Sequence, residues 1–154
     1  MAVYDARLYT ETVSAVTATP SVDVGLERRV GDECYVYVYN AGNSEIPPSY
    51  GAVCSAVSGY SVTISSTTSV DLCMGVVKHT TLTTGTYGWL MVRGFAQVEL
   101  GANNSAAAGQ LLALAGDGTF ALKSLSTGYA TPALGKTMEA ITSGASGTAY
   151  IRVW

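Results

Sequence analysis

Short stretches in which apolar and polar residues alternate are the dominant pattern along this chain. In the clearest, residues 34–39, three tyrosines alternate with Cys34, Val36 and Val38, as in a strand with two different faces. Other stretches rich in β-branched and aromatic residues predict strands over residues 60–64, 71–77, 87–100 and 148–154. Residues 110–115 and 119–123 flank Gly116-Asp117-Gly118, where Asp-Gly favours a tight hairpin.

Turn-forming residues separate these stretches, and signals for helices are weak. Residues 106–115 have helical propensity, but Gly109 interrupts them and their apolar run fits a buried strand as well. Residues 132–141 are the other candidate for one or two helical turns. Short strands at spacings of roughly 8–12 residues therefore predict an all-β fold, a small β-sandwich or barrel with at most one or two short helical turns.

The 154 residues fit one compact domain, and their first part differs from the rest. Residues 1–30 contain Pro20 and many of the charges, but little sustained alternation. We therefore divide the chain into an N-terminal arm or edge-strand segment, residues 1–30, and a single β domain, residues 31–154. The first segment could reach onto a neighbouring subunit or form the first hairpin of the domain.

Charged residues make up only 12% of the chain, against roughly 25% in an ordinary soluble domain. No apolar run approaches the ~20 residues of a membrane-spanning helix. The scarcity of charged residues therefore predicts that part of the surface is buried against other subunits in a homo-oligomer. Residues 1–77 carry three basic and eight acidic side chains, and residues 78–154 carry five basic and three acidic ones. Chance explains this asymmetry as well as docking of the front of one subunit on the back of another.

Few residues are candidates for catalysis, metal binding or nucleic-acid binding. His79 is the only histidine, and Cys34, Cys54 and Cys73 form no C-x-x-C pair, which argues against zinc and thiol redox sites. Neither phosphate-binding glycine motif occurs, and no basic cluster extends beyond Arg28-Arg29. We therefore expect no enzyme activity, cofactor, metal, nucleic acid or membrane partner. The enzyme alternative, a small hydrolase, needs one of the cysteines within hydrogen-bond reach of His79.

Aromatic area in this chain comes mostly with a hydroxyl group, because there are ten tyrosines and two phenylalanines. Tyrosine is favoured where one side of the ring is packed and the other is wet, as at interfaces. Tyr35, Tyr37 and Tyr39 are therefore our candidate subunit interface, with an ordinary half-exposed strand face as the alternative. Trp89 and Trp154 belong to the core or to the subunit interface; we assign Trp154 to the interface and favour the core for Trp89.

The segment Tyr87-Gly88-Trp89-Leu90-Met91-Val92-Arg93-Gly94, continued by residues 95–98, resembles a strand of tailed-bacteriophage head cement (decoration) proteins. The Ala/Gly-rich residues 106–111, the Gly-Asp-Gly hairpin and residues 135–140 before the last strand are also similar. The resemblance covers residues 72–154 best. It implies a β-rich subunit, commonly trimeric, that clamps neighbouring major capsid subunits and has no active-site residues.

The hypothesis that follows is a non-enzymatic viral structural protein, made in the bacterial host cytoplasm and placed on the capsid exterior. There it would stabilise the lattice of major capsid protein as a homotrimer. The candidate capsid-contact residues lie in the N-terminal segment, which would add an edge strand or arm: Tyr4, Arg7, Leu8 and Tyr9. The alternative is a carbohydrate- or host-binding β-sandwich module of a phage fibre or adhesin, which a shallow groove with exposed tyrosines and a carboxylate would favour.

Overall fold

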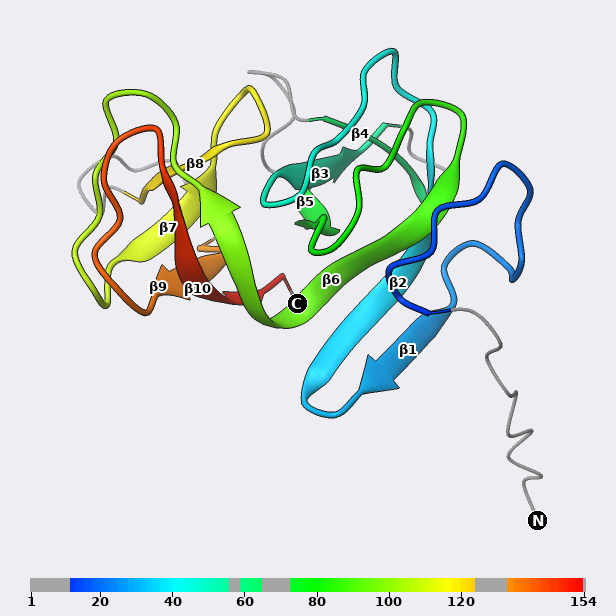
Figure 1. The fold of residues 1–154 in the computed structure, drawn as a ribbon, viewed down its shortest axis with the longest axis horizontal. Helices are drawn as coiled ribbons and strands as arrows, with labels where there is room; N and C mark the ends of the chain where they lie inside the picture. Colours follow the sequence, from blue (N-terminus) through cyan, green and yellow to red (C-terminus); the bar gives the residue numbers. More distant parts are fainter. Residues whose placement is uncertain (1–11, 56–58, 65–72, 124–132, 154) are drawn as a thin grey trace.

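The computed structural model describes residues 12–55, 59–64, 73–123 and 133–153. Within these ranges the chain forms strands and no helix, which confirms the all-β prediction (Figure 1). The strands are β1 (Glu27–Val30), β2 (Glu33–Asn40), β3 (Gly51–Cys54), β4 (Ser61–Ile64), β5 (Cys73–Val76), β6 (Tyr87–Glu99), β7 (Leu111–Leu114), β8 (Phe120–Leu122), β9 (Gly135–Thr137) and β10 (Ser146–Arg152).

Five of these strands close into a barrel. Their hydrogen-bonded order is β2-β4-β3-β5-β6, and β6 pairs back with β2, so this part of the sheet has no open edge. β2 and β4 run parallel, while the other neighbours are antiparallel. β1 pairs with the start of β2 and remains an edge strand. The interior of the barrel is filled by a cluster of small and branched side chains, including Val36, Val38, Ala52, Val62, Leu90 and Val92.

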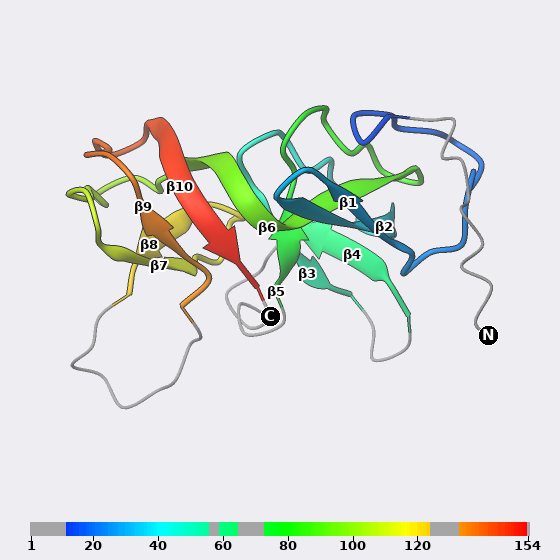
Figure 2. The ribbon, with the colours of Figure 1, turned by 90° about the horizontal axis from the view of Figure 1, so that it is seen from below.

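The long strand β6 belongs to two barrels. Its first half pairs with β2, and its second half, from Arg93 to Glu99, pairs with β10. Strands β9, β7 and β8 follow in order, and a parallel bridge from Phe120 to Leu100 returns the sheet to the end of β6. Figures 1 and 2 show the bent β6 passing from one group of strands to the other. The second interior includes Ala96, Val98, Leu112, Phe120, Ala149 and Ile151.

The two barrels have the same topology. The first uses β2 to β6, and the second uses the end of β6 followed by β7 to β10. In both, the hydrogen-bonded order is first, third, second, fourth and fifth strand, then back to the first. In both, the contact between first and third strand is the parallel one. Strand β6 is therefore the last strand of one unit and the first strand of the next.

One turn recurs four times in this duplicated architecture and supports it independently. In each case a bridging residue is followed three positions later by a residue with positive φ, and the next strand begins two residues after that. The bridging residues pair within each barrel, Ile46 with Leu82 and Ala106 with Ile141. The residues with positive φ are Ser49, Gly85, Gly109 and Gly144.

Most predicted strands are confirmed, since β2, β4, β5, β6, β7, β8 and β10 lie within or around the predicted stretches. Residues 111–114 are a strand, and residues 135–137 form β9 where helical turns were considered. β9 is flanked by β7 and β10, which satisfy its backbone groups on both sides. Strand β1 lies in the segment for which an edge strand was one of the two expectations, without bounds. Strands β3 and β9 were not predicted, because each begins at a glycine, which is depleted in strands, and neither shows alternation. The domain division at residue 30 stays a prediction.

Candidate functional site

The outer face of the second barrel carries a row of large side chains across four strands. Phe95 on β6 lies opposite Tyr150 on β10, which lies opposite Lys136 on β9. Lys136 in turn lies opposite Leu111 on β7. Opposed residues project from the same side of a sheet, so these four side chains form one line. We call them the outer row, and Met138, which follows β9, lies beside it.

The outer row is unusually apolar for a solvent-facing surface. Phe95 is 50% exposed, Met138 50% and Leu111 39%. The Phe95 and Tyr150 rings meet edge to face, with centroids 5.2 Å apart. Arg93 Nε donates a hydrogen bond to Tyr150 Oη at 3.2 Å, which raises the pKa of the guanidinium and holds the ring from its polar end. The row is therefore an ordered aromatic and aliphatic platform.

Charged side chains of both signs border this platform, since Asp32 and Glu33 line a hollow together with Phe95 and Tyr150. Lys136 belongs to the row itself, and Arg93 and Arg152 lie opposite each other on β6 and β10, two pairs along from Phe95 and Tyr150. Two carboxylates nearby along the chain are held by local hydrogen bonds. Glu99 accepts from the Ser146 hydroxyl, and Glu139 Oε1 accepts from the Thr148 backbone N–H at 2.6 Å.

Three hollows adjoin Tyr150, so this face of the barrel is not flat. The largest, about 530 Å³, lies where β6 turns from one barrel into the other, and Val30, Asp32, Glu33, Arg93, Gly94 and Phe95 line it with Tyr150. A second, about 350 Å³, lies beside Phe95 and Met138. A third, about 210 Å³, lies beside Leu111 and Arg152. Side chains of another molecule could enter such hollows, so the face is suited to binding.

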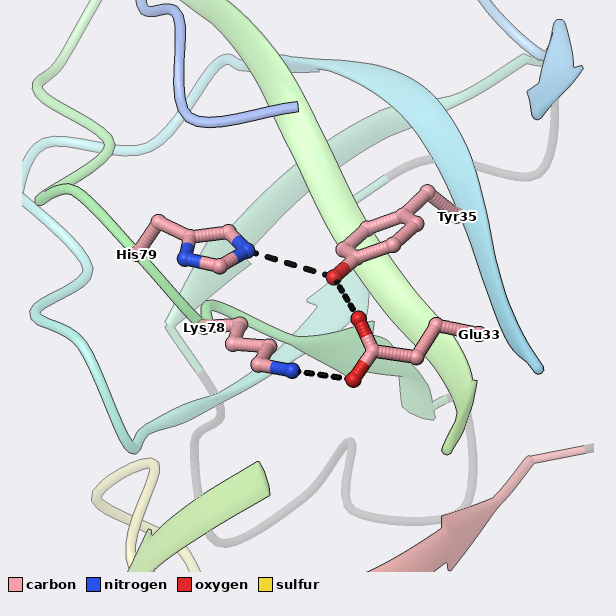
Figure 3. A network of polar contacts seen from close by, with 4 residues as sticks. All are labelled: Glu33, Tyr35, Lys78 and His79. Atoms are coloured by element: carbon pink, nitrogen blue, oxygen red, sulfur yellow. Dashed lines mark hydrogen bonds and ion pairs between the residues drawn. The ribbon is translucent and has the colours of Figure 1, made fainter. Parts of the chain in front are cut away.

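A polar network holds Glu33 in the wall of the largest hollow (Figure 3). Tyr35 Oη donates to Glu33 Oε2 at 2.5 Å, and the Lys78 ammonium pairs with Oε1. Tyr35 Oη also lies 3.2 Å from His79 Nε2. The network joins the start of β2 to the segment that follows β5, and it fixes the direction of the Glu33 side chain.

The pKa values in this network follow from burial and from these partners. Burial opposes ionisation of Glu33, but the hydrogen bonds from Lys78 and Tyr35 and the Lys78 charge outweigh it, so the pKa of Glu33 is lowered. Burial, together with Glu33, raises the pKa of Tyr35. Burial and then the Lys78 charge lower the pKa of His79, against the opposing pull of Glu33.

Acid should therefore destabilise the protein in two steps. A lowered folded-state pKa means that stability is present above the unfolded value and is lost as pH falls through the folded value. For His79 the loss begins below about pH 6.5, and for Glu33 below about pH 4.5. His79 is the only histidine. His79→Gln should therefore reduce the loss of unfolding free energy between pH 8 and pH 5.5, and it should leave the steeper loss of unfolding free energy below pH 4.5. Urea unfolding at pH 8, 5.5 and 3.5 measures both, and an unchanged slope in H79Q between pH 8 and 5.5 would contradict the assignment.

The tyrosines predicted as a subunit interface lie mostly inside the monomer. Tyr35 and Tyr37 are 0% and 1% exposed, and Tyr37 Oη forms hydrogen bonds with the hydroxyls of Thr17 (3.2 Å) and Ser21 (3.1 Å). Strand β2 faces a barrel interior on one side, and residues 12–26 and His79 contact its other side, so neither face is open. An interface does not fit Tyr35 and Tyr37 as placed here, and it stays a prediction for the half-buried Tyr39.

The remaining predicted residues are placed as follows. Trp89 lies in the core, as predicted. Trp154 and the four capsid-contact candidates, Tyr4, Arg7, Leu8 and Tyr9, lie outside the described residues. Sequence reasoning missed the outer row, although a signal was present. Along β6 the buried Ala96 separates Phe95 from the polar Gln97. Phe95 and Gln97 therefore lie on the same side of the strand, which is its polar face.

The three cysteines differ in burial, with Cys34 and Cys54 half-buried and Cys73 buried. Cys73 is buried and donates to the Gly75 carbonyl, and burial raises the pKa of its thiol to about 12, so it is not a thiolate at neutral pH. The described residues hold no cluster of three or more His, Cys, Asp or Glu suited to a metal ion. Those same residues also include no helix long and apolar enough to cross a membrane.

Comparison with known proteins gives a likeness in structure and none in sequence. No family model matches the chain. No curated protein matches it in sequence either. In structure, the chain is similar to the head fiber gp8.5 N base of bacteriophage phi29, with a TM-score of 0.53 and 16% sequence identity, over 77% of this chain and 93% of that one. At this identity the likeness shows a common fold alone.

Proposed function

We propose that this chain is a non-enzymatic structural subunit of a tailed-bacteriophage virion that binds the outside of the head and stabilises the lattice of major capsid protein. One observation carries the proposal: the fold matches that of a phage head fiber N base over 77% of this chain and 93% of that solved chain. The aromatic and cationic outer row, which offers binding without a catalytic group, is consistent with it. A homotrimer and the N-terminal residues as capsid contact remain parts of this proposal.

The mechanism is additive binding. A subunit that binds only the assembled shell stabilises it by RT ln(1 + [L]/Kd) at each site, about 2.7 kcal/mol when the free concentration is a hundred times Kd. Many such sites on one head would raise the free energy needed to separate capsid subunits. A compact duplicated barrel suits this role, because its backbone hydrogen bonds are closed within each barrel and its outer faces are available for contact.

Co-sedimentation tests the proposal. Heads purified from the phage that carries this coding sequence, with the gene deleted, are mixed with the purified chain. We expect saturable binding at micromolar concentration and a higher temperature of head disruption in calorimetry. An unrelated β-barrel protein of similar size serves as the control. The absence of saturable binding to these heads would overturn the proposal. Binding that leaves the disruption temperature unchanged would overturn the part of the proposal that says the chain stabilises the capsid.

A second candidate function rests on the composition of the largest hollow. The carboxylates of Asp32 and Glu33, the Arg93 guanidinium and the exposed Phe95 ring lie around one cavity. A hydrogen-bonding carboxylate beside an exposed aromatic ring also suits a sugar. A carbohydrate- or host-binding module of a fibre or adhesin is therefore the alternative. Binding on a glycan array that is lost in Phe95→Ser, without binding to heads, would favour it.

A further inference from the structure

We infer that the largest hollow of this protein binds one neutral pyranose ring, that is, an uncharged sugar residue of a polysaccharide. The hollow lies where the two barrels meet, and its volume, about 530 Å³, is within the roughly 300–1,000 Å³ of small-molecule sites. The inference goes beyond head binding, which does not require it. It deepens the second candidate function and rests on that proposal for the choice of cavity.

Two aromatic rings form the apolar wall of the hollow. The Phe95 ring is half exposed and meets the Tyr150 ring edge to face. The hydrogen bond from Arg93 holds Tyr150 at its polar end, so both rings are in place before a ligand arrives. One face of a pyranose ring carries mostly C–H groups, and such a face packs on an exposed aromatic ring. The wall therefore suits a flat ligand with one weakly polar face.

Two carboxylates give the hollow its hydrogen-bond acceptors. Each oxygen of Glu33 has one partner, Tyr35 or Lys78, which fixes the carboxylate and leaves lone pairs for a ligand (Figure 3). The pKa of Glu33 is lowered, so the group is ionised at neutral pH. The Asp32 side chain is fully exposed and adds a second carboxylate. Hydroxyl groups donate strongly to ionised acceptors, so both carboxylates suit the hydroxyl groups of a sugar.

The charges around the hollow are balanced, and this disfavours charged ligands. The Lys78 ammonium pairs with Glu33. The Arg29 guanidinium lies 3.8 Å from Asp32, and Arg93 contributes a guanidinium with N–H groups to spare. An anion would meet two carboxylates, a cation would meet a guanidinium, and an apolar ligand would bury all of them without hydrogen bonds. Hydroxyl groups both donate and accept, so a neutral sugar satisfies the whole set.

NMR titration of the isotope-labelled full chain tests the inference. The neutral probes are the methyl glycosides of glucose, galactose, mannose and N-acetylglucosamine, and the charged probes are the corresponding uronic acids and 2-amino sugars. We expect at least one neutral probe to shift the backbone amide signals of Glu33, Gly94 and Tyr150 saturably, with a Kd on the order of millimolar for a ligand of this size. Its two charged counterparts should bind at least about tenfold more weakly.

Two variants with matched controls locate the bound sugar. Phe95→Ser should weaken binding about tenfold by removing half of the apolar wall. Met138→Ser should not weaken it, because Met138 is equally exposed beside the outer row but does not line this hollow. Asp32→Ala should weaken binding at least about fivefold by removing an acceptor, whereas the exposed Asp23, outside the hollow, should tolerate the same change. Circular dichroism confirms that each variant is folded.

Several results would overturn the inference. One is the absence of saturable shifts with every neutral probe at about 50 mM. Another is a charged probe that binds as tightly as its neutral counterpart, since the balanced charges would then select nothing. Loss of binding in M138S but not in F95S would place the sugar outside the hollow. Co-sedimentation of the wild-type chain with heads is measured separately, so a failure of head binding and a failure of sugar binding are distinguished.

Discussion

Asn40→Asp is expected to destabilise the protein by about 4 kcal/mol at pH 8, because two buried carbonyl groups lose their hydrogen-bond donors at roughly 1–3 kcal/mol each. Asn40 is 0% exposed at the end of β2. Its Nδ2 donates to the backbone carbonyls of Ser44 (3.0 Å) and Leu82 (2.9 Å), and its Oδ1 accepts from the Gly42 N–H at 3.0 Å. The amide therefore ties the loop after β2 to Leu82, which forms a bridge with Ile46 in the first barrel.

The substitution keeps the shape of the side chain, removes the two donated hydrogen bonds and introduces an ionisable carboxyl group. An introduced carboxylate would face two carbonyl oxygens, so its protonated form is favoured and its folded-state pKa is raised. Its penalty then appears as pH rises through about 4, the ordinary aspartate value, and reaches full size above the raised folded-state pKa. The difference between wild type and N40D should therefore narrow at pH 4.

Urea unfolding at pH 8 and pH 4 measures both parts of this prediction. Asn43→Asp is the matched control, since it makes the same change in the same loop at an exposed residue. Its effect should stay within about 0.5 kcal/mol. A destabilisation of N40D that does not change with pH would contradict the placement of the Asn40 amide between two carbonyl groups.

Gly94→Ala is expected to cost about 3 kcal/mol, roughly 1–2 for a positive φ and 1–3 for overpacking. Gly94 is the point at which β6 leaves one barrel for the other, and its φ is 132°. An added Cβ would lie 2.9 Å from Glu33 Cγ and 3.3 Å from Met91 Sδ. The methyl group would push against the side chain that Lys78 and Tyr35 hold in place.

Gly31→Ala separates the two contributions. Gly31 also has a positive φ, 61°, but a Cβ there would meet nothing within 4 Å. Its cost should therefore be the backbone part alone, roughly 1–2 kcal/mol. Denaturant unfolding of both variants gives the comparison. If G94A were no less stable than G31A, Glu33 would not be packed against the bend of β6.

The positions of most strands follow from the sequence by itself. Alternation marks a strand because side chains project to opposite faces in turn, and this property is local. It placed β2, the long β6 and the terminal β10, and the Asp-Gly pair placed the hairpin of β7 and β8. The sequence also contains few candidate catalytic or metal-binding residues, since one histidine and three separated cysteines limit the sites that any fold could build.

Only the tertiary structure decided how the strands pair and which faces are covered. The parallel contact of β2 with β4, the sharing of β6 and the duplicated topology join residues far apart in the chain, where pairing depends on the total surface buried. By alternation alone Tyr37 and Phe95 are alike, because each places an aromatic ring on one side of a strand. Residues 12–26 contact one ring and bury it, while the other stays on an open sheet face. The sequence determined which residues share a face, and long-range packing determined whether that face became core or surface.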